Sequence, residues 1–170
     1  MSQPAQANEG AAKNVRALAP ADLGRVVDID RAATGGSPRG FFEKRLAAAE
    51  RAPKAYVTLG FVENGQIEGF VMAHILDGEF GGREPVAVLD AIAVCPAARG
   101  HGGAHALMAA LADVARRRGA RELRTQVLWS DQPLVHFLTA AGFTLGHRFV
   151  LQRPCGMIEG EVATGETEQD

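Results

Sequence analysis

Cysteines, long apolar runs and targeting signals are scarce in this sequence. Its 170 residues include two cysteines, Cys95 and Cys155, which are too few for a disulfide framework and form no C-x-x-C pair. No apolar run approaches the roughly 18 residues that span a bilayer, and the N-terminus lacks the apolar core of a signal peptide. We therefore expect a soluble, cytoplasmic protein without a membrane partner.

Metal-binding and nucleic-acid-binding patterns are also missing. His101 and His105 are four residues apart, but no glutamate follows the first histidine, as an H-E-x-x-H zinc site requires. No long stripe of lysine and arginine with interleaved aromatic residues suggests nucleic acid. The net charge is −2, but residues 159–170 hold five acids and no base, which leaves 18 bases against 15 acids elsewhere. We expect neither a metal nor a nucleic-acid partner, and the mildly basic body is compatible with a polyanionic small molecule.

The composition that remains is typical of one globular domain, with 46% hydrophobic and 22% charged residues. Both ends of the chain are poor in large apolar side chains, as in disordered segments. We expect a flexible tail over residues 1–13, a domain over residues 14–153, and an acidic, flexible tail over residues 154–170.

Apolar periodicity along the domain predicts the element order βααβββαβαβ, which indicates an α+β domain around a mixed sheet. A short strand at Val15–Leu18 precedes a helix that opens at Pro20, and a second helix carries Phe42 on its apolar face. The dipeptide Asn64-Gly65 predicts a hairpin, because both residues tolerate positive φ. The expected later elements are strands over Tyr56–Glu63, Gln66–Leu76, Val86–Val94, Leu123–Trp129 and Thr144–Gln152, and helices over residues 104–118 and 131–141.

The most informative segment is the glycine-rich turn Arg99-Gly100-His101-Gly102-Gly103-Ala104, between a buried strand and an amphipathic helix. The first amides of a helix have no internal partners, and the helix dipole adds partial positive charge there. Arg99 can add a full charge, so the turn is a candidate anion site. The string G-x-x-x-x-G-K-[ST] is absent, G-x-G-x-x-G does not fit, and the pattern that remains is R-x-x-G-x-A.

The segment from Val94 to Met108, VCPAARGHGGAHALM, resembles the coenzyme-A signature of the GNAT N-acetyltransferase superfamily. The order of segments from Asn14 to Arg153 is similar to that fold, and Ala-Gly-Phe at residues 141–143 matches an x-G-F string that the family often carries. The resemblance implies a mostly antiparallel mixed sheet flanked by helices, with splayed parallel central strands.

The resemblance also implies acetyl-CoA as the co-substrate. In the family the pyrophosphate lies on amides that match the glycine-rich turn, and the pantetheine arm runs beside the central strand. The implied contacts are Ile92, Ala93, Val94, Arg99, Gly100, His101, Gly102, Gly103 and Ala104. Asp131 stands where relatives often carry an asparagine that contacts the cofactor; the alternative is a helix N-cap.

Transfer of an acetyl group from a thioester to an amine needs a neutral amine, and a lysine-like amine has a pKa of about 10.4. Asp90 is the candidate base, because it interrupts an apolar strand and a buried carboxylate is costly unless it is paired or functional. The alternative is a hydrogen-bonded structural aspartate. By analogy with the family, the backbone amide near Val94 would polarise the carbonyl. The tyrosine that acts as the family's acid is matched here by Leu138.

In relatives, the two N-terminal helices and the loop before the signature strand form the acceptor pocket. The matching candidates in this chain are Arg39, Phe41, Glu79, Phe80 and Trp129.

The leading hypothesis is therefore an N-acetyltransferase that moves acetyl from acetyl-CoA to a primary amine of a small molecule or a protein. A non-catalytic coenzyme-A-binding sensor or interaction module is the alternative, and a nucleotide-binding regulator is a third possibility. Because many relatives dimerise, a homodimer is also possible.

Overall fold

The computed structural model describes residues 14–36, 38–78 and 82–155. The expected N-terminal tail and most of the expected C-terminal tail lie outside these residues. Within the described ranges, no helix has both the length and the apolar character that crossing a membrane requires.

Five strands form one mixed sheet in the order β1-β2-β3-β4-β5. Among the first four strands, each runs antiparallel to its neighbour in the sheet, whereas β5 runs parallel to β4. This arrangement confirms the expected α+β class with a mixed, mostly antiparallel sheet, in which the parallel pair β4–β5 lies at one edge of the described sheet. The strands are β1 (Val15–Ala17), β2 (Tyr56–Glu63), β3 (Gln66–Leu76), β4 (Val86–Val94) and β5 (Glu122–Arg124).

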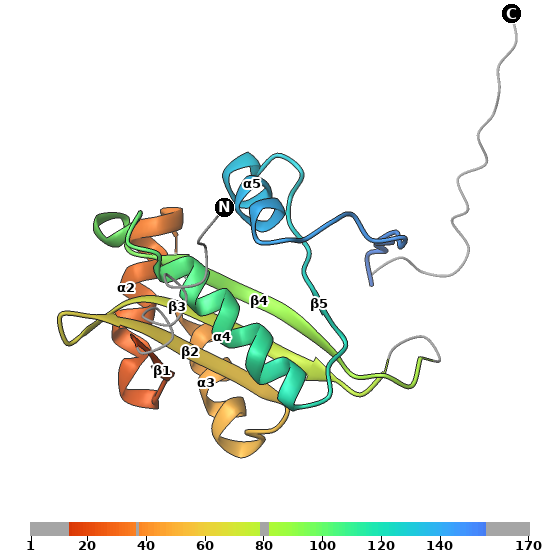
Figure 1. Cartoon of the computed structure of the whole chain (residues 1–170), viewed down its shortest axis with the longest axis horizontal. Helices are drawn as coiled ribbons and strands as arrows, with labels where there is room; N and C mark the ends of the chain where they lie inside the picture. Colours follow the sequence, from red (N-terminus) through yellow and green to blue (C-terminus); the bar gives the residue numbers. More distant parts are fainter. Residues whose placement is uncertain (1–13, 37, 79–81, 156–170) are drawn as a thin grey trace, which may run out of the picture.

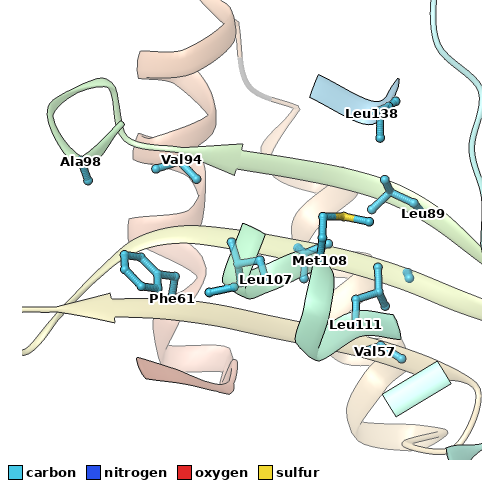
Figure 2. Close-up of a cluster of buried hydrophobic side chains, with 12 residues drawn as sticks. Val57, Phe61, Leu89, Val94, Ala98, Leu107, Met108, Leu111 and Leu138 are labelled. Atoms are coloured by element: carbon cyan, nitrogen blue, oxygen red, sulfur yellow. The ribbon is translucent and has the colours of Figure 1, made fainter. Parts of the chain in front are cut away.

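Helices cover both faces of the sheet (Figure 1). Helix α4 (Gly103–Arg117) lies across one face, while α2 (Leu23–Thr34) and α3 (Arg39–Arg51) lie on the other. Helix α5 (Gln132–Ala140) follows β5. Because side chains alternate along a strand, the sheet forms two apolar cores, one under α4 and one under α2 and α3. Figure 2 shows the first core, where Leu107, Met108 and Leu111 of α4 meet residues of the strands.

The hairpin expected at Asn64-Gly65 is confirmed. Asn64 has a φ of 52° and Gly65 a φ of 79°, which are the positive values that a two-residue hairpin turn of this kind needs. Strands β2 and β3 flank this turn directly and pair antiparallel.

Strand β5 is shorter than the expected Leu123–Trp129. It ends at Arg124, and the hydroxyl of Thr125 then donates to the carbonyl oxygen of Leu89 at 3.1 Å. A side chain therefore takes a place that a backbone group would take in a continuing ladder. The chain diverges from β4 at this point, and Trp129 is 86% exposed.

The prediction of a last strand at Thr144–Gln152 is wrong. The backbone of this segment adopts no regular structure, and Leu145, Phe149 and Leu151 are each more than 90% exposed. Strand-like alternation is not sufficient for a strand, because the backbone also needs a neighbour to pair with. None of the described strands pairs with this segment, although an ion pair between Arg148 and Glu122 links it to the first residue of β5.

Two glycines in helices give a matched test of packing. A Cβ on Gly103 would lie 2.7 Å from a ring carbon of Phe61, whereas a Cβ on Gly24 would meet nothing within 4 Å. We expect Gly103→Ala to lower the free energy of unfolding by about 1–3 kcal/mol because of overpacking. Gly24→Ala should raise it by about 0.5 kcal/mol through helix propensity. Urea unfolding followed by circular dichroism measures both, and two changes of the same sign would contradict the packing argument.

The start of α2 is held by a charged contact. Both oxygens of Asp22 accept hydrogen bonds from Arg16, at 2.7 and 2.9 Å, and the Ala19 N–H also donates to Asp22 at 2.7 Å. The hydrogen bonds from Arg16 are the main cause that lowers the pKa of Asp22 below its ordinary value.

Replacing Asp22 should therefore make stability less dependent on pH. We expect Asp22→Asn to lower the free energy of unfolding by about 1 kcal/mol at pH 7. A carboxylate with a lowered folded-state pKa stabilises above its unfolded pKa of about 3.9, and the effect disappears as the pH falls through the folded value. The difference from wild type, measured by urea unfolding across this pH range, should thus shrink in acid. Asp28→Asn, at an exposed pair with Arg31, is the control and should change stability by less than about 0.5 kcal/mol.

Candidate active site

The glycine-rich turn joins β4 to α4 at the end of the sheet. After a 3-10 turn at Pro96–Ala98, the chain passes through Gly100 and Gly102, whose φ values are 86° and 81°. These are left-handed conformations that side chains other than glycine rarely adopt. The turn therefore depends on glycine for its shape, and α4 begins immediately after it.

The first turn of α4 presents unpaired backbone donors. The Ala106 N–H donates to the Gly102 carbonyl at 2.9 Å and is the first amide bonded into the helix. Among the described residues, the N–H groups of Gly102 to His105 meet no backbone acceptor. Arg99 is exposed and has no ion pair with a described side chain, so its charge is available beside these amides. Four donors, a helix dipole and a guanidinium together can hold a diphosphate.

Two residues of β2 support this turn, and little in the sequence pointed to either role. The ring of Phe61 lies directly beneath Gly103, so only glycine fits there without movement of the ring. Glu63 accepts from Nδ1 of His101 at 3.0 and 3.1 Å. Both residues were expected in a strand, but their contact with the turn depends on how α4 crosses the sheet.

The edge of β4 that faces β5 is open over its second half. Pairing with β5 covers Val86 to Val88, and Thr125 reaches Leu89. The Cys95 N–H donates to the backbone carbonyl oxygen of Glu68 in β3 at 2.8 Å. Because backbone groups of a strand point alternately to its two sides, those of Val94 and Ile92 point to the open edge, and those of Ala93 point to β3. The contact of these residues with a pantetheine arm stays a prediction.

Asp90 occupies a β-bulge in β4. Met72 of β3 pairs with Ala91 and the next residue, Ala73, pairs with Leu89, so Asp90 has no partner across the ladder. A bulge of this kind changes the direction of a side chain and is common next to active sites. The Asp90 side chain is 8% exposed, and Arg45 of α3 contacts its Oδ1 at 3.1 Å.

His74 completes the polar contacts of Asp90. Its Nδ1 lies 2.9 Å from Oδ1 and 3.0 Å from Oδ2. Tyr56 pairs with His74 across β2 and β3, with 6.4 Å between the ring centroids. The guanidinium of Arg45 lies 5.7 Å from the centre of the Tyr56 ring and 5.3 Å from that of Phe41, within cation–π range. Asp90 and Phe41 were predicted from the sequence, whereas Arg45, His74 and Tyr56 were not.

The other acceptor-site candidates do not gather here. Arg39 is the exposed first residue of α3, and Trp129 is exposed in the turn before α5. Glu79 and Phe80 lie outside the described residues.

The start and middle of α5 carry the two expected departures from the family. Asp131 accepts from the Leu134 N–H at 3.2 Å, so it caps the helix, as the alternative interpretation has it; a contact with cofactor stays a prediction. Leu138 is 4% exposed and points toward β4 near Leu89 in Figure 2. The position that the resemblance matches to the family's tyrosine is therefore an apolar contact here, with no proton to give.

No group of three histidine, cysteine, aspartate or glutamate side chains in the described part of the chain could hold a metal ion.

Comparison with known proteins identifies a family that matches this chain. Residues 25–143 match the model of the acetyltransferase (GNAT) family, whereas comparison with curated proteins finds no match. Among solved structures, AAC(6′)-Iy in complex with the bisubstrate analogue CoA-S-monomethyl-acetylneamine is 23% identical, with a TM-score of 0.66 over 82% of this chain and 96% of that chain.

Two further solved structures have the same fold. An acetyltransferase of Trypanosoma brucei is 22% identical, with a TM-score of 0.62 over 82% of this chain and 98% of that chain. The aminoglycoside acetyltransferase meta-AAC0020, from an uncultured soil metagenomic sample and in complex with sisomicin, is 17% identical, with a TM-score of 0.64 over 82% and 93%. At these sequence identities, the similarity to the solved structures shows only that the fold is shared. The match to the family model covers more than half of the chain and shows its family. This chain belongs to the GNAT acetyltransferase family.

Proposed function

We propose that this chain transfers an acetyl group from acetyl-CoA to a primary amine of a small molecule or a protein, by direct attack within a ternary complex. The observation that carries the proposal is the left-handed turn at Gly100 and Gly102, which leaves the first amides of α4 unpaired at the end of a strand whose edge is open.

The residues of this region suit the two ends of acetyl-CoA. The amides of Gly102 to His105 and the guanidinium of Arg99 would bind the diphosphate. The open edge of β4 offers backbone groups of Ile92 and Val94 to the amide-containing arm, as an added strand would use them. The Val94 N–H can also stabilise negative charge that develops on an acyl oxygen.

The acceptor side is the face of the sheet under α2 and α3, where Asp90, His74 and Arg45 form a polar cluster in an otherwise apolar layer. Two solved relatives are described with an aminoglycoside or an aminoglycoside-derived analogue. Such compounds carry several primary amines, so an amine of this class belongs in any panel of acceptors.

A non-catalytic coenzyme-A-binding module is the second candidate, and the buried Leu138 favours it. Without a tyrosine, the leaving thiolate has no obvious acid at the family's position. A thiol has a pKa of about 8.5, however, so a thiolate can leave unassisted or take a proton from water.

Arg99 gives a test of the cofactor site that does not require turnover. We expect Arg99→Ala to weaken acetyl-CoA binding by about ten- to a hundred-fold, because a charge-assisted hydrogen bond to phosphate is lost. Arg116→Ala is the control, since Arg116 pairs with Asp113 in the last turn of the same helix. Isothermal titration calorimetry measures both, and equal affinities for the two variants would contradict the site.

Thiol release tests the reaction itself. Incubation with acetyl-CoA and a panel containing an aminoglycoside, free lysine and a peptide N-terminus should release free coenzyme A in step with acetylated amine. Direct attack predicts that acetyl-CoA alone leaves no acetyl group on the protein, as measured by mass spectrometry. Binding of acetyl-CoA without acetylation of any amine would favour the non-catalytic module.

A further inference from the structure

We infer that His74, oriented by Asp90, is the group that removes the proton from the acceptor's ammonium. The inference rests on the proposed function and names the residue that would perform its first chemical step. In this arrangement Asp90 is a positioning residue rather than the base.

Both oxygens of the Asp90 carboxylate already have partners. Both of its oxygens lie within 3.0 Å of Nδ1 of His74, and Oδ1 also accepts from Arg45 at 3.1 Å. The side chain is 8% exposed, whereas that of His74 is 22% exposed. An amine that enters from solvent therefore meets the imidazole before it can meet the carboxylate.

The same contacts determine which nitrogen of His74 is available. An ionised carboxylate can only accept hydrogen bonds, so Nδ1 must carry the proton. In the neutral ring Nε2 then has a free lone pair, which is the form that a general base needs. No described residue forms a hydrogen bond with Nε2, so the lone pair is not occupied by the fold.

The position of the pair along the sheet fits this role. Asp90 follows Leu89, which accepts a hydrogen bond from Thr125 just after β5, and lies where the open edge begins. The bulge in β4 leaves Asp90 outside the ladder, and its carboxylate meets the His74 ring. His74 therefore lies one strand away from the point where a pantetheine arm would present its thioester.

Three neighbours set the electrostatic surroundings of the imidazole. Asp90 of β4 stabilises the imidazolium that forms, whereas Arg45 of α3, which pairs with the same carboxylate, opposes it. The phenol of Tyr56 of β2 lies beside the ring. The arrangement is that of an acid–histidine pair, in which the acid fixes the tautomer and supports the charge.

The proposed reaction begins with proton transfer to His74. Nε2 takes one proton from the ammonium, which leaves a neutral amine and an imidazolium. The amine nitrogen forms a bond to the thioester carbon, the C–S bond breaks and its electron pair leaves with the thiolate. The second proton of the attacking nitrogen passes to the thiolate through water, and His74 returns its proton to solvent.

Substitutions at the pair test the inference in the whole chain. We expect His74→Gln, whose amide can still donate to Asp90, to lower kcat/KM by at least about 100-fold at pH 7 with unchanged acetyl-CoA affinity. Asp90→Asn should cause a similar loss, and the double variant should lose little more, because the two residues act as a unit. His136→Gln, on the exposed surface of α5, is the control and should retain activity.

Two further readouts separate a base from a structural residue. The pH profile of kcat/KM for His74→Gln should follow only the ionisation of the amine, without the step that the wild type shows. In the free protein, ¹⁵N NMR should show the proton of neutral His74 on Nδ1, and Asp90→Asn should shift it toward Nε2.

Each result decides the matter. An active wild type whose His74→Gln variant keeps kcat/KM and its pH profile overturns the role of His74 and leaves the proposed function intact. A proton on Nε2 in the free wild type has the same consequence. A wild type that binds acetyl-CoA but acetylates no amine contradicts the proposed function, and the role of His74 with it.

Discussion

Strand β4 pairs with β3 from Val86 to Val94, interrupted only by the bulge at Asp90, but β5 pairs with it only from Val86 to Val88. Buried backbone groups need partners, so an edge that is left open inside a protein must be met by water or by a ligand. The Thr125 hydroxyl donates to the Leu89 carbonyl, and no described strand pairs with the β5-facing backbone of β4 beyond it. The bulge at Asp90 lies where this open edge begins, and the glycine-rich turn that follows β4 lies where it ends.

The two faces of the sheet differ in polarity. Under α4 the contacts are apolar, and the helix is brought close enough for Gly103 to rest on Phe61. This packing fixes where the unpaired amides of the helix point. Under α2 and α3 a charged cluster interrupts the apolar layer. A buried ionic group is a weak source of stability, because desolvation offsets most of the attraction. Folding stability alone is therefore a weak explanation for this cluster.

One position bears directly on the proposed mechanism. Leu138, which the sequence resemblance matches to the family's tyrosine, packs against the α4 core. A leucine there seals the core and removes a proton donor from the vicinity of the leaving group. In the reaction that we propose, catalysis would therefore depend on activation of the amine, since the thiolate is a tolerable leaving group without assistance. The polar cluster around Asp90 is the group of residues that we propose for this activation.

Features set by neighbouring residues could be read from the sequence alone. The Asn64-Gly65 hairpin, the buried strand Val86–Val94, the glycine-rich turn and the helix after it depend on local chemistry, and their bounds agree closely with the structure. Features that depend on strand pairing could not be predicted in this way. Counting outward from the hairpin places Tyr56 opposite Ala73, but a bulge at Glu68 shifts the pairing by one residue and brings His74 there instead. A second bulge frees Asp90 from the ladder, and the lack of a neighbouring strand among the described residues leaves Thr144–Gln152 unpaired. A one-residue change of register moves every side chain to the opposite face, and only the assembled sheet decides it.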